Sequence, residues 1–173
     1  GAVAYTTKDP SDYLDGKQFH VSSGARHDSS SDRNKFSILA AGAYGDIEAM
    51  VQVVDHSLSE RNLHDDVTMA ANSLDGEQES LFTKLKYNLN DSISFTLTAD
   101  EQNWSGDWNL ATDVGMSFFP AIVNTSSSLG QDRGFRDRYS LDIDLEINSI
   151  FAERASVKFY SQTTEQSQMT TKE

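Results

Sequence analysis

The sequence predicts an all-β protein, an antiparallel up-and-down transmembrane β-barrel of which this chain forms about seven strands, as part of a larger barrel. Three observations lead to this expectation. Apolar and polar residues alternate along several segments, charged residues fall on the polar side of that alternation, and the connections between the segments are unequal in length. A period of two places one class of side chain on each face of a strand.

In chain order, the expected strands are 17–27, 36–44, 47–53, 81–89, 92–100, 139–148 and 155–161. The clearest is the segment from Tyr139 to Asn148, in which apolar residues occupy the odd positions and polar residues the even ones. In a helix, the acidic residues of this segment would be scattered around the axis, so a strand is the better interpretation. The first, second and last segments show a weaker form of the pattern, and no helix is expected.

The unequal lengths of the connections between the expected strands are the basis for predicting a membrane barrel. Gly45-Asp46, Asn90-Asp91 and the stretch around Asn148-Ser149 are expected to be tight turns, whereas 62–79 and 103–137 are expected to be long polar loops. Barrels of the outer membrane have short periplasmic turns and long external loops. Tyr44 and Tyr87 precede short turns on the apolar side, as expected for residues of an aromatic girdle. A half-exposed soluble sheet would show the same alternation, but not the same difference between the loops.

Composition excludes several other classes of protein. The formal net charge of -13 would repel a polyphosphate, so no nucleic-acid partner is expected. The absence of cysteine removes disulfides, thiolate metal sites and thiol nucleophiles. No segment approaches the roughly 18 apolar residues of a spanning helix, and residues 1–10 lack the features of a signal peptide. We therefore expect the chain to be a mature or truncated product whose beginning lies elsewhere.

The chemistry-bearing residues do not predict an enzyme. The sequence contains no nucleophile elbow, phosphate loop or placed general base, so no catalytic residue is assigned. The four histidines lack metal-site spacing, so no metal ligand is assigned and no intrinsic cofactor is expected. The candidate ligand-binding residues lie in the expected long loops: His64, Trp104, Trp108, Phe118 and Phe119. Alternatively, His64 is a solvated loop residue and the aromatic residues pack the loop onto its neighbours or the membrane interface.

Both ends of the chain resemble a known family. Gly1-Ala2-Val3-Ala4-Tyr5-Thr6-Thr7-Lys8-Asp9-Pro10-Ser11-Asp12-Tyr13-Leu14 is similar to the plug–barrel junction of TonB-dependent receptors, in particular the haem, haemoglobin and transferrin receptor group. The segment from Phe159 to Thr171 resembles the strand in that group that runs into a Thr-rich loop. These motifs are short, and they cover the two ends of the chain only.

The resemblance implies a barrel of about 22 strands around an N-terminal plug in the outer membrane of a Gram-negative bacterium. Residues 1–16 would be the end of the plug and its junction with the barrel, and residues 17–173 the first strands with their extracellular loops. The implied partners are outer-membrane lipid, the TonB energy-transducing complex and a transported iron source, either haem, a haem protein or a ferric siderophore. The Phe-Arg-Ala-Pro and Asn-Pro-Asn-Leu patterns of the group are absent, so no haem-ligating residue is transferred.

Two functions are therefore carried forward. The first is an energy-coupled outer-membrane receptor for active uptake of an iron source, which binds its ligand without covalent chemistry. The second is a secreted soluble β-sandwich that binds carbohydrate, with Trp104 and Trp108 as a stacking platform. Behaviour of the chain in the absence of detergent would separate them.

Overall fold

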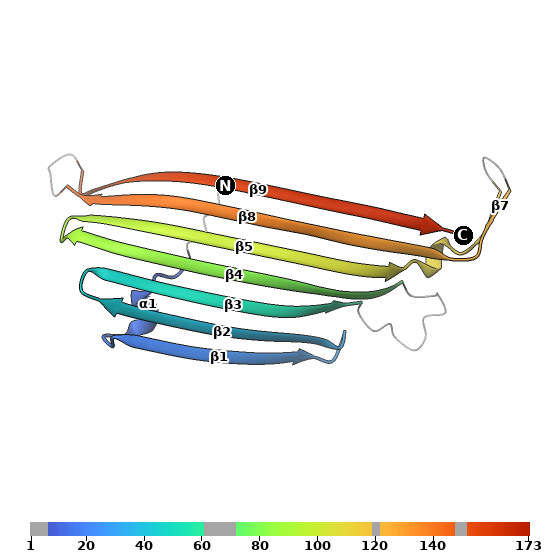
Figure 1. Cartoon of the computed structure of the whole chain (residues 1–173), viewed down its shortest axis with the longest axis horizontal. Coiled ribbons are helices and arrows are strands. Elements are labelled where there is room, and N and C mark those ends of the chain that lie inside the picture. Colours follow the sequence, from blue (N-terminus) through green and yellow to red (C-terminus); the bar gives the residue numbers. More distant parts are fainter. Residues whose placement is uncertain (1–6, 61–71, 119–121, 148–151) are drawn as a thin grey trace.

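The computed structural model describes residues 7–60, 72–118, 122–147 and 152–173. The described chain is all-β, and its main feature is a seven-stranded antiparallel sheet in the order β1-β2-β3-β4-β5-β8-β9 (Figure 1). The strands are β1 (Phe19–Asp28), β2 (Arg33–Tyr44), β3 (Ile47–Ser59), β4 (Ser73–Asn90), β5 (Ile93–Asn109), β8 (Ser128–Glu146) and β9 (Arg154–Lys172). The all-β class, the antiparallel meander and the seven strands predicted from the sequence are confirmed.

The connection between β5 and β8 holds the remaining small elements. It contains the 3₁₀ turn η1 (Ala111–Asp113) and a separate two-stranded sheet of β6 (Gly115–Ser117) and β7 (Val123–Thr125). The main sheet is open, with β1 and β9 as its edges. In the described part of the chain, no helix is long and apolar enough to cross a lipid bilayer.

The strands extend well beyond the alternating segments. β4 begins at Ser73 and β5 ends at Asn109, so much of the polar sequence expected in the loops 62–79 and 103–137 is strand. Likewise β9 continues through the Thr-rich tail to Lys172. These loop predictions were wrong because backbone ladders to neighbouring strands satisfy the peptide groups whether or not the side chains alternate. Threonine also favours the extended backbone.

The two shortest turns and the two longest connections nevertheless lie at opposite ends of the sheet. The turns at 45–46 and 91–92 mark one end, which we call the short-turn end. Connections 60–72 and 110–127 mark the other, the long-connection end, where β1 and β2 are also joined through 29–32. The turn predicted at Asn148-Ser149 lies outside the described residues.

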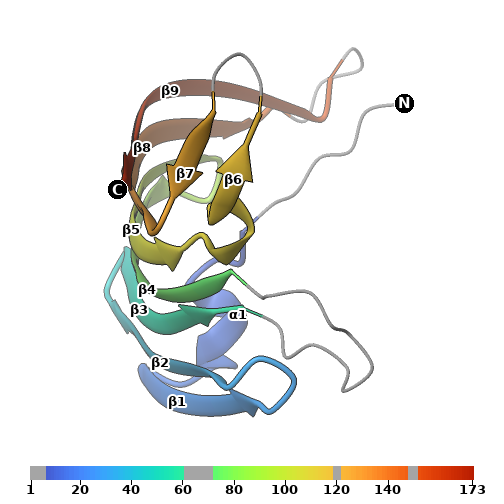
Figure 2. The ribbon, with the colours of Figure 1, turned by 90° about the vertical axis from the view of Figure 1, so that its right-hand side faces the viewer.

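The sheet curves, and the α-helix found in the described part of the chain lies inside the curve (Figure 2). This helix, α1 (Ser11–Leu14), is a single turn that the sequence did not predict. Asp12 accepts a hydrogen bond from the Asp9 amide at its start (2.8 Å), and Asp15 and Gly16 end it with positive φ. Leu14 is buried against Leu39, Ala41 and Met50 of β2 and β3, in a small core on the concave face.

Candidate functional site

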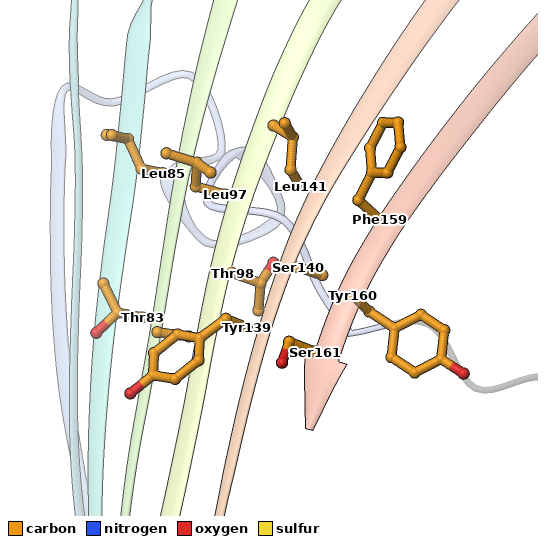
Figure 3. A pocket seen from close by; sticks show the side chains of 11 residues that line it. Thr83, Leu85, Leu97, Thr98, Tyr139, Ser140, Leu141, Phe159, Tyr160 and Ser161 are labelled. Atoms are coloured by element: carbon orange, nitrogen blue, oxygen red, sulfur yellow. The ribbon is translucent and has the colours of Figure 1, made fainter. Parts of the chain in front are cut away.

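An uncovered apolar band runs across the convex face of the sheet. The cross-strand register places its side chains in continuous rows, one of which contains Ala49, Leu85, Leu97, Leu141 and Phe159. Figure 3 shows part of this row, with Leu85, Leu97, Leu141 and Phe159 side by side on four strands. Leu97 is 52% exposed and Phe159 59% exposed, and no other described element covers the band. In water, such a surface would be an association site.

The apolar band ends at a defined border on the side of the long-connection end, which we call the upper border. On the convex side of each strand, the last apolar residue towards the long-connection end is followed by polar positions. These border residues are Phe36, Val53, Leu81, Ala99, Tyr139 and Phe159 on β2, β3, β4, β5, β8 and β9. Beyond them the convex face is mostly polar, with Asp55, Glu79, Glu101 and Asp137 immediately after four of the border positions. Phe135 and Leu129 of β8 and Met169 of β9 are exceptions.

The upper border runs obliquely to the rungs of the sheet. There are five strand pairings from β2 to β9. In three of them the border residue of the next strand lies two residues nearer the short-turn end than the partner of the previous border residue, and in the other two the border residues are paired directly. The displacement is about 20 Å along the strands for about 24 Å across them, given the usual rise per residue and strand spacing. The border is therefore inclined by roughly 40° to the rungs. A plane that cuts a sheet of tilted strands produces this inclination.

Beside the small apolar core under α1, the concave face carries a closely packed polar cluster. Lys84 of β4 is buried, with a side chain only 6% exposed, and its ammonium group donates to the carbonyl oxygens of Thr7 (3.1 Å) and Lys8 (2.9 Å). It also donates to Asp9 Oδ1 at 2.9 Å, and Lys86 lies 3.7 Å from the other carboxylate oxygen of Asp9. Residues 7–9 are thereby attached to the inner wall of the sheet.

The concave wall continues across β5, β8 and β9 as a charged, hydrogen-bonding surface. Lys158 pairs with Asp142 at 2.9 Å, and Arg138 pairs with Asp100 at 2.8 Å. Lys158, Asp142 and Arg138 line a polar hollow together with Asp9, Asp12, Thr96, Ser140, Asp144 and Gln162. The two faces of the sheet thus differ sharply, with uncovered apolar side chains outside and paired charges inside.

The structure separates the residues that the sequence singled out for ligand binding. Trp104 and Trp108 belong to β5, not to a loop, and both lie on the concave face. Trp108 Nε1 donates to Asp132 Oδ2 at 2.9 Å. The indole of Trp104 covers Gly134 of β8, where a Cβ atom would overlap the ring. Phe118 is 72% exposed just after β6 and is not brought together with the tryptophans, whereas His64 and Phe119 lie outside the described residues.

Two carboxylates near the long-connection end have lowered pKa values. Ser30 donates both side-chain and backbone hydrogen bonds to Asp28, which lowers the pKa of that carboxyl group, and Arg33 at 3.6 Å adds to the effect. Lys172 at 2.8 Å and Ser128 at 3.2 Å lower the pKa of Asp113. Within the described ranges, no group of three or more histidine or acidic side chains is arranged to hold a metal ion.

Sequence reasoning placed Lys84 on a polar strand face but missed its role. Its partners precede it by 75 residues or more, so no local pattern connects them. The comparisons with known proteins add no assignment: no protein-family model and no curated protein matches the chain.

Proposed function

We propose that this protein is a TonB-dependent outer-membrane receptor for active uptake of an iron source, haem or a haem protein. The observation that carries the proposal is the apolar band on the convex face, with an upper border inclined by roughly 40° to the rungs of the sheet. Strands of outer-membrane barrels are tilted by 35–45° from the barrel axis. A flat membrane surface would therefore cross the rungs of such a sheet at the same angle of about 35–45°.

The length of the strands supports the same orientation. β4, β5, β8 and β9 contain 17 to 19 residues, which corresponds to about 60 Å. The hydrocarbon core of a bilayer is only about 30 Å thick. The band would therefore occupy the lipid, with the short turns at the periplasmic surface, and the polar halves of the strands would extend beyond the membrane as an external wall.

The concave face has the properties of a polar lumen. Several charged groups on this face are paired, and a charge that faces a wet lumen is far less costly than one that faces lipid. Residues 7–16 occupy part of the concave side and, by their resemblance to the plug–barrel junction, would connect a plug to the wall. Lys84 would hold this junction in place while the plug moves.

The mechanism is binding followed by conformational gating. The external wall and loops would bind the iron source, and force from the TonB complex, applied through the plug, would open a path along the concave wall. Affinity for the ligand must then differ between the closed and open states. No covalent step on the ligand is required.

The soluble carbohydrate-binding sandwich remains the second candidate function. Its tryptophans, Trp104 and Trp108, share a face of one strand, which is a feature of stacking platforms. A sandwich, however, covers its apolar sheet face with a second sheet. In the described residues the convex face lacks such a cover, which favours the membrane receptor.

Cell fractionation followed by a growth assay tests the proposal. The natural protein should remain in the outer-membrane fraction and require detergent for extraction. Cells that depend on haem as their iron source should stop growing when the protein is deleted or when the proton gradient is dissipated. Recovery of the protein in the soluble periplasmic or secreted fraction would overturn the receptor assignment.

A further inference from the structure

A row of basic side chains crosses the concave face near the long-connection end. The register pairs Arg26 of β1 with Lys35 of β2, and Lys35 with His56 of β3. Lys35 has the same parity along β2 as the buried Leu39 and Ala41, which face α1, so the whole row lies on the concave face. In Figure 1, α1 lies towards the opposite end of these strands, so the helix leaves the row open.

The electrostatics of this row are unusual for the protein. Arg26 and Lys35 are exposed and directly opposite each other, an arrangement of like charges that destabilises a sheet. The carboxylate of Asp28, the next concave-face residue of β1, pairs with Arg33 at 3.6 Å and accepts hydrogen bonds from Ser30. Arg26 and Arg33 both attract the Asp28 carboxylate, whereas Lys35 has no ion pair among the described residues. These cationic groups occur in a chain with a formal net charge of -13.

The same rung continues to an aromatic surface. His56 pairs with Gln78 of β4, and Gln78 pairs with Trp104 of β5. Lys35 and Trp104 are three strand spacings apart, which is about 14 Å. The indole of Trp104 lies over Gly134 and is only partly buried, so part of the ring is accessible from the concave side. Acid groups and a flat apolar body could thus be bound along one rung.

We propose that Arg26, Lys35 and His56 form an anion-binding site for the acid groups of the ligand, with Trp104 as a flank for its planar body. This inference rests on the proposed function and assigns the ligand to a class: a planar molecule with carboxylates along one edge. Guanidinium and ammonium groups form strong charge-assisted hydrogen bonds with carboxylates. An anion between Arg26 and Lys35 also removes the repulsion between them.

Binding of ferric haem and of its dimethyl ester, followed by tryptophan fluorescence in detergent micelles, tests the site. The dicarboxylate should bind about tenfold more tightly than the ester, since one charge-assisted hydrogen bond contributes roughly that factor. The double variant Arg26→Gln/Lys35→Gln should lose this preference. The double variant Lys17→Gln/Arg133→Gln, which removes the same charge elsewhere, should keep it, and circular dichroism of each variant monitors folding.

The outcomes are distinct. Equal binding of acid and ester to the unmodified protein, or a preference that survives Arg26→Gln/Lys35→Gln, would overturn the anion site and leave the receptor function intact. Absence of binding by either compound would overturn the site together with haem as the ligand. Failure of the receptor function itself is detected separately, by recovery of the protein in a soluble fraction.

Discussion

Lys84 illustrates how one residue determines the arrangement of the inner wall. An ammonium group with a side-chain exposure of 6% must have its donors satisfied, and here a carboxylate and two carbonyl oxygens accept from it. Lys86, two residues further along the same face, is more exposed, and among the described residues its ion pair is with the carboxylate of Asp9. The two lysines therefore form a matched pair for mutation.

Lys84→Met should detach residues 7–9 from the wall. We expect a loss of about 1–3 kcal/mol in the free energy of unfolding, because the substitution removes the charge-assisted hydrogen bonds of a buried ammonium group. Lys86→Met should cost less than about 1 kcal/mol, as for an exposed ion pair. Urea titration in detergent micelles and proteolysis of the N-terminal segment measure the two effects. Equal losses for the two variants would contradict the assigned role of Lys84.

The contact between Trp104 and Gly134 makes a second prediction at this scale. A methyl group at Gly134 would overlap the indole of Trp104 and approach the Glu165 carbonyl oxygen to 2.8 Å, so Gly134→Ala should destabilise the protein by about 1–3 kcal/mol. Gly42→Ala is the control, because the nearest atom there is 3.7 Å away. A double-mutant cycle with Trp104→Leu should recover part of the loss. Full additivity of the two substitutions would show that the indole is not the cause.

Individual strands have an apolar half and a polar half on the convex face. Along β5, Phe95 and Leu97 lie in the convex band, whereas Asn103 and Asp107 lie on the same face beyond its border. The same backbone ladder runs through both halves. Side-chain chemistry, and not secondary structure, therefore determines which part of the strand can be in contact with lipid.

Arginine substitutions on β5 test this division. On the proposed function, Leu97→Arg should lower folding stability in lipid vesicles by about 1–3 kcal/mol, because it places a cation on the lipid side of the border, between the interface and the bilayer midplane. Asn103→Arg, on the same face beyond the border, should cost about 1 kcal/mol or less. Stability is measured by denaturant titration of vesicle-inserted protein. A similar cost at both positions would contradict the border.

The end of the sheet near η1 depends on an ionised carboxylate. The folded-state pKa of Asp113 is lowered, so its contribution to stability is complete above the ordinary value of 3.8 and is lost as the pH falls from there through the folded value. Asp113→Asn should therefore reduce the loss of stability between about pH 5 and pH 2. Asp107→Asn serves as the control. Identical acid titrations of the unmodified protein and Asp113→Asn would refute the linkage.

The sequence predicted the elements that are specified by a pattern of neighbouring residues. It did not predict those that depend on contacts between residues far apart in the chain. Alternation within the band identified the strands around Leu97 and Leu141, since one apolar and one polar environment act on successive residues. Beyond the border the convex face of β5 is polar, and on its concave face Gly106 separates the two tryptophans, so the strand around Trp104 showed no regular alternation and was predicted to be a loop. The contact between Lys84 and Asp9 depends on tertiary docking and has no local signature either.

At the scale of the whole molecule, the central claim is that an open curved sheet presents an apolar convex face to lipid and a charged concave face to water. A soluble single-sheet protein would leave the convex band in contact with solvent, and its two edge strands would invite association. The proposed membrane barrel gives the band a hydrocarbon environment. It also accounts for the inclined border, which a docking surface for another sheet would not require.

Quenching of a fluorophore at single cysteines on β5 tests this claim most directly, and the native chain contains no cysteine. The protein is placed in lipid vesicles with a label at Leu97→Cys, Thr98→Cys or Asn103→Cys, and exposed to a lipid-soluble or a water-soluble quencher. We expect the lipid-soluble quencher to act at position 97 only, and the water-soluble quencher to act at positions 98 and 103. Quenching at position 97 by the water-soluble agent, with none by the lipid-soluble one, would contradict it.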